Sequence, residues 1–63
     1  MDIILNLNGI EWRLDHTESY QTVKTAMNAK DTSIVRVLAG AASEATDLHI
    51  RHDSVVSWAV YSA

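Results

Sequence analysis

The dipeptide Asn8-Gly9 is the feature that most restricts how this chain can fold. Asparagine and glycine both tolerate a positive φ angle, which a two-residue type I′ turn needs at both central positions. Counting outward from this turn gives these opposite pairs on one face: Leu7 with Ile10, Leu5 with Trp12 and Ile3 with Leu14. The other face pairs Asn6 with Glu11, Ile4 with Arg13 and Asp2 with Asp15. Since the first face is wholly apolar, the sequence predicts a β-hairpin over residues 2–15.

A helix is predicted over residues 18–29. Asp15 or Thr17 can cap its first turn by accepting a hydrogen bond from a free backbone N–H, with Glu18 completing a capping box to Asp15. The side chains that share one side at helical spacing are Tyr20, Val23, Ala26 and Met27. We expect this amphipathic helix to pack on the apolar face of the hairpin.

The remainder of the chain has the pattern of strands. Residues 33–39 are rich in β-branched side chains, and an alternating pattern returns at residues 47–51. The small residues at 40–45 between them predict a loop, although they would also suit a helical turn. Residues 55–61 are almost continuously apolar, which is typical of a strand that is covered on both faces at the centre of a sheet.

These elements predict an α+β domain with the order ββαββ, in which one amphipathic helix packs on one face of a mixed sheet. The pattern resembles the ubiquitin-like, or β-grasp, group of small domains. The resemblance rests on residues 1–9 (MDIILNLNG), residues 10–14 (IEWRL) and the capped helix, and it covers most of the chain. It implies that the last strand lies parallel to the first, between the hairpin and the third strand.

The same resemblance bears on function. Carrier domains of this group react through a C-terminal Gly-Gly, whereas this sequence ends Tyr61-Ser62-Ala63 and has no glycine after Gly40. Conjugation and sulfur transfer are therefore not expected. The other common use of the group is a rigid sheet that presents a binding surface, and this is what the resemblance implies here.

Chain length predicts a single domain, residues 1–63, with a small core, because folding at this size removes only about 60% of the surface of the unfolded chain. There is no cysteine, so disulfides and thiol chemistry are excluded. No stretch approaches the roughly 20 apolar residues of a membrane span, and residues 1–3 lack the basic region of a signal peptide. We therefore expect a cytoplasmic protein, and its compactness suits a phage protein or a small bacterial regulator.

Three arginines offer a route to nucleic acid. Arg13, Arg36 and Arg51 fall on neighbouring predicted strands, where they can form a row on the outer face of the sheet. The net charge of −3 and the scattered basic residues, however, are not typical of a phosphate-binding surface. Nucleic acid is therefore the alternative partner.

The histidines raise the question of a metal site or an enzyme. His49 and His52 are three residues apart, and residues at that spacing on a strand point to opposite faces. A zinc site would also need a third ligand, such as Asp15 or His16. A hydrolytic triad with Ser54 or Ser57 needs a cleft, for which so small a core leaves little room. We predict no metal, no cofactor and no catalysis.

Alternation along the strands predicts the surface that carries function. If Val35 and Val37 face the core together with Val56, Trp58 and Val60, a second apolar set turns outward. That set is Ile4, Ile34, Leu38, Val55, Ala59 and Tyr61. A reversed assignment or a bulge would scatter it. One helix covers only one face of a sheet, and exposed apolar patches mark contact sites. The sequence therefore predicts a non-enzymatic module that binds another protein, or a second copy of itself, through its open sheet face or a sheet edge.

Overall fold

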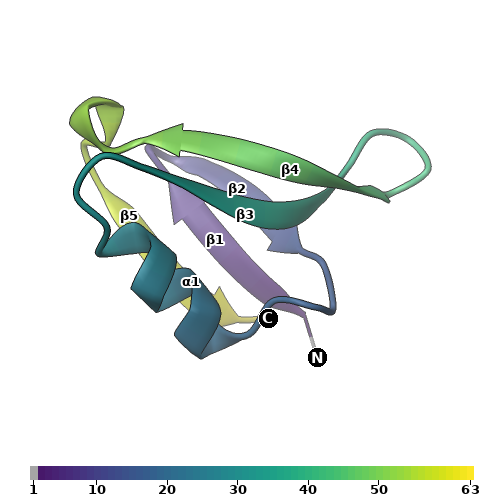
Figure 1. The fold of residues 1–63 in the computed structure, drawn as a ribbon. Helices are drawn as coiled ribbons and strands as arrows, with labels where there is room; N and C mark the ends of the chain where they lie inside the picture. Colours follow the sequence, from purple (N-terminus) through teal and green to yellow (C-terminus); the bar gives the residue numbers. More distant parts are fainter. Residues whose placement is uncertain (1) are drawn as a thin grey trace.

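The fold is a five-stranded antiparallel sheet with one α-helix on one face (Figure 1). It is described by a computed structural model that covers residues 2–63. In chain order the elements are β1 (Ile3–Leu7), β2 (Ile10–Leu14), α1 (Tyr20–Met27), β3 (Thr32–Ala39), β4 (Glu44–Arg51), the short 3-10 helix η1 (His52–Ser54) and β5 (Trp58–Ser62). The α+β class is confirmed. The ββαββ order of a β-grasp domain is not confirmed, because three strands, β3, β4 and β5, follow the helix instead of two.

The N-terminal hairpin forms in the predicted register. Its strand pairs are Ile4 with Arg13, Leu5 with Trp12, Asn6 with Glu11 and Leu7 with Ile10. Asn8 has φ 53° and Gly9 has φ 86°, so both turn residues occupy the positive-φ region that a type I′ turn requires. The local signal of the turn therefore sets the register of β1 against β2.

The last strand does not lie where the resemblance placed it. The strand order is β4-β3-β2-β1-β5, and β5 pairs antiparallel with β1 at the edge of the sheet. β2 pairs directly with β3, with Leu14 opposite Val37, so no gap is left for a central strand. The prediction of a parallel, central last strand is therefore wrong.

The apolar run at 55–61 has a different explanation. Only Trp58–Ser62 forms the strand, and within it Val60 is buried while Ala59 and Tyr61 are exposed. Val56, which was expected in the core, is 90% exposed and precedes the strand. The run combines a connecting segment with an edge strand, so its continuous hydrophobicity does not reflect burial on both faces.

Asn8 holds this connection against the hairpin. Its backbone N–H donates to the Ser57 carbonyl at 2.9 Å, and its side-chain oxygen accepts from the N–H groups of Val56 at 2.7 Å and Ser57 at 3.2 Å. Its side-chain amide also donates to the Ser54 carbonyl at 3.1 Å. The residue that closes the hairpin turn thus also fixes the segment that leads into β5.

The helix is shorter than predicted and has a different cap. Ser19 is the N-cap, since its hydroxyl accepts from the Thr22 N–H at 3.2 Å while the Thr22 hydroxyl accepts from the Ser19 N–H at 2.9 Å. Asp15 and Thr17 therefore do not cap α1, and the helix begins at Tyr20 and ends at Met27. This reciprocal pair satisfies two backbone donors that the first turn leaves free.

Glu18 ties the start of the helix to the sheet. One of its carboxylate oxygens accepts from the Arg36 backbone N–H at 2.8 Å, and the other accepts from the Thr22 hydroxyl at 2.7 Å. The Asp15 N–H donates to the Arg36 carbonyl at 3.1 Å. The loop between β2 and α1 thus continues the pairing along β3 after β2 has ended.

One hydrophobic cluster forms the core, between α1 and the face of the sheet that we call the inner face. Its buried members are Leu5, Leu14, Val23, Met27, Val35, Val37, Ile50 and Val60. Val23 and Met27 come from the helix, as predicted, whereas Tyr20 is exposed and Ala26 only partly buried. Val35 and Val37 face inward as expected, and this fixes the direction of every other side chain on β3.

Candidate protein-binding surface

A row of side chains crosses all five strands on the face of the sheet opposite α1, which we call the outer face. The strand pairings give its order: Tyr61 lies beside Ile4, Ile4 beside Arg13, Arg13 beside Leu38, and Leu38 beside Ala45. Directly opposite residues in an antiparallel sheet point to the same face. Because the strand neighbours Leu5 and Val37 are buried on the inner face, this row points away from the helix.

Most of the apolar residues predicted for an interface do lie on the outer face. Ile34 is 54% exposed and Tyr61 is 37% exposed, and Ala59 is also exposed. Ile4 and Leu38 are half-buried. α1 covers the other face of the sheet (Figure 1), so the helix does not shield these side chains. The outer face therefore presents apolar groups on β5, β1 and β3, while β2 places the charged side chains of Glu11 and Arg13 between them.

Val55 is the exception, and its assignment to the outer face is wrong. It lies between η1 and β5 rather than in a strand, and it is partly buried against the core cluster. Alternation of side chains between the two faces holds only within a strand, and β5 begins at Trp58, so alternation does not extend to residue 55. Val55 therefore packs against the core cluster and is not part of the outer-face row.

Tyr61 is fixed to the outer face by a polar contact. Its hydroxyl donates to a carboxylate oxygen of Glu11, so the side chain reaches from β5 across β1 to β2. The hydrogen bond to Glu11, with smaller contributions from burial and from the Glu11 charge, raises the pKa of Tyr61 above its ordinary value of 10.0. The ring of Tyr61 is held in a defined position at one end of the row, which lowers the entropy that a contact through this ring would cost.

The three arginines all lie on the outer face, but each lies near a carboxylate. Arg13 is 3.8 Å from Asp2 and donates to the Ser43 hydroxyl at 3.2 Å. Arg51 pairs with Asp53 at 3.2 Å. Arg36 lies directly opposite Asp47 in the sheet. The expected row is thus interrupted by negative charge, which lowers its attraction for a phosphate backbone.

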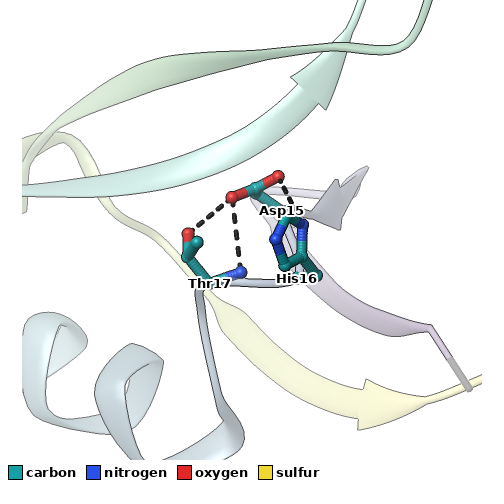
Figure 2. Close-up of polar contacts among 3 residues, drawn as sticks. All are labelled: Asp15, His16 and Thr17. Atoms are coloured by element: carbon teal, nitrogen blue, oxygen red, sulfur yellow. Dashed lines mark hydrogen bonds and ion pairs between the residues drawn. The ribbon is translucent and has the colours of Figure 1, made fainter.

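A polar cluster lies at the end of β2 (Figure 2). One Asp15 oxygen accepts from the hydroxyl and the backbone N–H of Thr17, and the other lies 3.3 Å from Nδ1 of His16. The hydroxyl of Thr17 is the main cause that holds the pKa of Asp15 below its ordinary value of 3.8. Asp15 is buried and His16 is exposed. The Asp15 carboxylate therefore has a structural role, in which its bonds to Thr17 stabilise the turn before α1.

Two surface hollows are too small to hold a metabolite-sized ligand. The first has a volume of about 180 Å³ and is lined by Asp2, Ile3, Leu14, Asp15, His16 and Leu38. The second has a volume of about 230 Å³ and is lined by Lys30, Asp31, Thr32, Arg51 and Asp53. Small-molecule sites usually have roughly 300–1,000 Å³. Neither hollow therefore competes with the outer face as a candidate site.

His49 lies in β4 and His52 in η1, so the two do not share one strand as the sequence suggested. His49 is exposed on the outer face, opposite Ile34. His52 lies in η1, and its Nε2 is 2.9 Å from the hydroxyl of Ser33, whose strand neighbour Ile50 belongs to the core. Within residues 2–63, no three His, Cys, Asp or Glu side chains are grouped so that they could hold a metal ion.

The contact between Ser33 and His52 has no signal in the sequence, because 19 residues separate the two. A serine beside an imidazole is two thirds of a hydrolytic triad, which also needs a group that orients the imidazole and a cleft for substrate. In the part of the chain that the structure describes, the His52 ring is hydrogen-bonded to Ser33 and to no carboxylate. The pair secures η1 against the start of β3.

Comparison with protein-family models, with curated proteins and with solved structures finds no match for this chain. No helix within residues 2–63 has the length and hydrophobicity to cross a membrane.

Proposed function

We propose that this chain is a non-enzymatic module that binds another protein through its outer face. The observation that supports this most is the row formed by Tyr61, Ile4, Arg13, Leu38 and Ala45, which runs across five strands. A helix of eight residues covers only the inner face. A partner that removes the apolar side chains of the row from water lowers the free energy of the system, which favours binding.

The composition of the row indicates what kind of partner would fit. Arg13 lies between Ile4 and Leu38, so one positive charge is flanked by apolar groups. Arginine and tyrosine are among the residue types that most often dominate binding at protein interfaces. A partner with apolar side chains around one carboxylate would match this pattern. The proposal does not depend on a β-grasp relationship, which stays a prediction. We expect the module to act in the cytoplasm, where small domains without disulfides are more common.

The test is capture of partners from the native host with four forms of the chain. The wild type should retain a defined protein, and Ile34→Glu and Leu38→Glu should weaken that binding roughly tenfold or more, about 1.4 kcal/mol for each tenfold change. Val56→Glu is the matched control, because Val56 is the most exposed of the large apolar side chains and lies outside the sheet. Equal capture by the wild type and by both outer-face variants would contradict the proposal.

Oligonucleotide binding by the wild type and by arginine variants separates this proposal from nucleic-acid binding. Contacts to phosphates weaken steeply with ionic strength, whereas contacts through apolar side chains do not. We expect no salt-sensitive binding to single- or double-stranded oligonucleotides. Binding that is lost in Arg13→Ala or Arg36→Ala and that falls with added salt would support the alternative instead.

A further inference from the structure

The strand β4 leaves one of its edges unpaired by any other strand within residues 2–63. It is eight residues long and lies at the end of the sheet, where it pairs with β3 alone. The chain contains no proline, a residue that often protects such edges. Figure 1 shows β4 at the outer margin of the sheet, on the side away from β1 and β5. An edge of this length can template pairing with another strand.

The backbone groups that point to this edge can be identified from the register. The Arg36 carbonyl accepts from Asp15, so Arg36 directs its backbone groups toward β2 and away from β4. Its opposite residue, Asp47, therefore directs its N–H and C=O away from β3, toward the free edge. Backbone direction repeats every two residues, so His49 and Arg51 do the same.

The side chains along this edge of one copy can pair favourably with the same side chains of a second copy. Asp47, His49 and Arg51 are exposed on the outer face, with opposite charges two residues on either side of His49. When two copies of a strand pair antiparallel about a two-fold axis perpendicular to the sheet, one residue lies opposite itself. If that residue is His49, Asp47 of each copy lies opposite Arg51 of the other.

Other registers lack this match. An axis at Asp47 puts two like charges opposite each other, which destabilises a strand pair. An axis at Leu48 leaves Arg51 opposite an alanine, Ala45. The opposite edge of the sheet, β5, has five residues and no charged side chain, so nothing there selects a register.

We propose that two copies of this chain pair through β4 in antiparallel orientation, with the two-fold axis at His49. The residues from Asp47 to Arg51 then form about six backbone hydrogen bonds between the copies and two pairs of opposite charge. The two sheets become one ten-stranded sheet, in which both outer faces lie on the same side. This inference rests on the β4 edge and stands whether or not the outer face binds another protein.

Cysteine scanning tests the register directly, because the chain has no cysteine of its own. Single cysteines are placed at positions 47, 48, 49 and 51, and the oxidised proteins are analysed by non-reducing electrophoresis. The Cα atoms of opposite residues in a hydrogen-bonded pair are about 5.5 Å apart, within the disulfide range, whereas two residues at position 48 would be roughly 8 Å apart. We expect His49→Cys to cross-link most rapidly. A maximum at another position, or equal slow cross-linking at all of them, would overturn the proposal.

Charge reversal tests the pairing of side chains. Sedimentation equilibrium should show a dimer for the wild type, and Asp47→Arg or Arg51→Asp alone should weaken it at least tenfold. The double variant restores opposite charges across the axis and should recover the wild-type dimer. Circular dichroism verifies that each variant folds. A double variant no more dimeric than the single ones would contradict the register.

Hydrogen exchange supplies a test that needs no substitution. The His49 amide points to the free edge, whereas the Leu48 amide points to β3, so only the first gains a partner in the dimer. Exchange at His49 should slow as protein concentration rises, and exchange at Leu48 should change much less. Exchange at His49 that does not depend on concentration would show that the edge stays unpaired.

Discussion

Asn8 has two structural roles, one through its backbone and one through its side chain. Its φ of 53° belongs to the turn, and its side-chain amide makes three hydrogen bonds to the 54–57 segment. The two roles can be separated by substitution. Glycine adopts positive φ freely but cannot make the side-chain hydrogen bonds, whereas alanine cannot make these bonds and also disfavours positive φ.

We therefore predict that Asn8→Gly destabilises the fold by about 1–2 kcal/mol, the contribution of a few exposed hydrogen bonds, and that Asn8→Ala costs about 1 kcal/mol more. Urea unfolding followed by tryptophan fluorescence measures both values, since Trp58 lies at the start of β5. Wild-type stability in Asn8→Gly would show that the side chain does not secure the segment that leads into β5.

Asp15 makes stability depend on pH in the acidic range. Its pKa is lowered in the folded protein, chiefly by the hydroxyl of Thr17, so the folded state favours the ionised carboxylate. The stabilisation is present above the ordinary value of 3.8 and is lost as the pH falls through the lower value of the folded state.

We predict that the melting temperature falls between pH 5 and pH 2 by less in Thr17→Val than in the wild type. Thr25→Val is a matched control, because the Thr25 hydroxyl bonds only to the Gln21 carbonyl within the helix. The account of Asp15 would be wrong if all three proteins lost the same stability on acidification.

At the scale of elements, the helix cap is the interaction most open to measurement. Ser19→Ala removes the side chain that accepts from the Thr22 N–H and should cost about 1 kcal/mol of unfolding free energy. Ser19→Gly should cost only a few tenths of that, since glycine is tolerated at this position. Thermal unfolding of both variants tests this, and equal losses would argue against a capping role.

The hairpin and the helix could be predicted because their signals are local. Asn8-Gly9 determines both the turn and the register of the eight paired residues beside it, and helical spacing places Val23 and Met27 on the core. The N-cap of α1 is harder to predict from sequence, because Asp15, Thr17 and Ser19 are all residue types that cap helices well and lie within five residues of one another. Asp15 is occupied by a local hydrogen bond from Thr17, and a tertiary contact of Glu18 with the Arg36 backbone positions the start of the helix.

The position of β5 could not be predicted for the same physical reason. Strand order depends on contacts between residues far apart in sequence, such as Leu5 with Val60, which no local pattern encodes. The candidate surface was predicted in part. Ile34 and Leu38 follow from the burial of Val35 and Val37 within one strand, whereas Val55 was misplaced because the strand begins only at Trp58.

At the scale of the whole molecule, a sheet with one helix has one face covered by the helix and one face exposed to solvent. The inner face is closed by α1, and the outer face keeps exposed apolar side chains among charged ones. If the chain pairs through β4, the outer faces of two copies join, and the surface that a partner can contact doubles without any change to the fold. The two proposals are thus independent in their tests but compatible in one assembly.

Site-specific photo-cross-linking in the native host tests the outer face most directly. A photoreactive amino acid replaces Ile34, Leu38 or Val56, one position at a time. We predict a discrete cross-linked product from positions 34 and 38 and none from position 56, although Val56 is the more exposed side chain. Products that form equally well from all three positions, or only from position 56, would contradict the claim that the outer face is where this protein meets its partner.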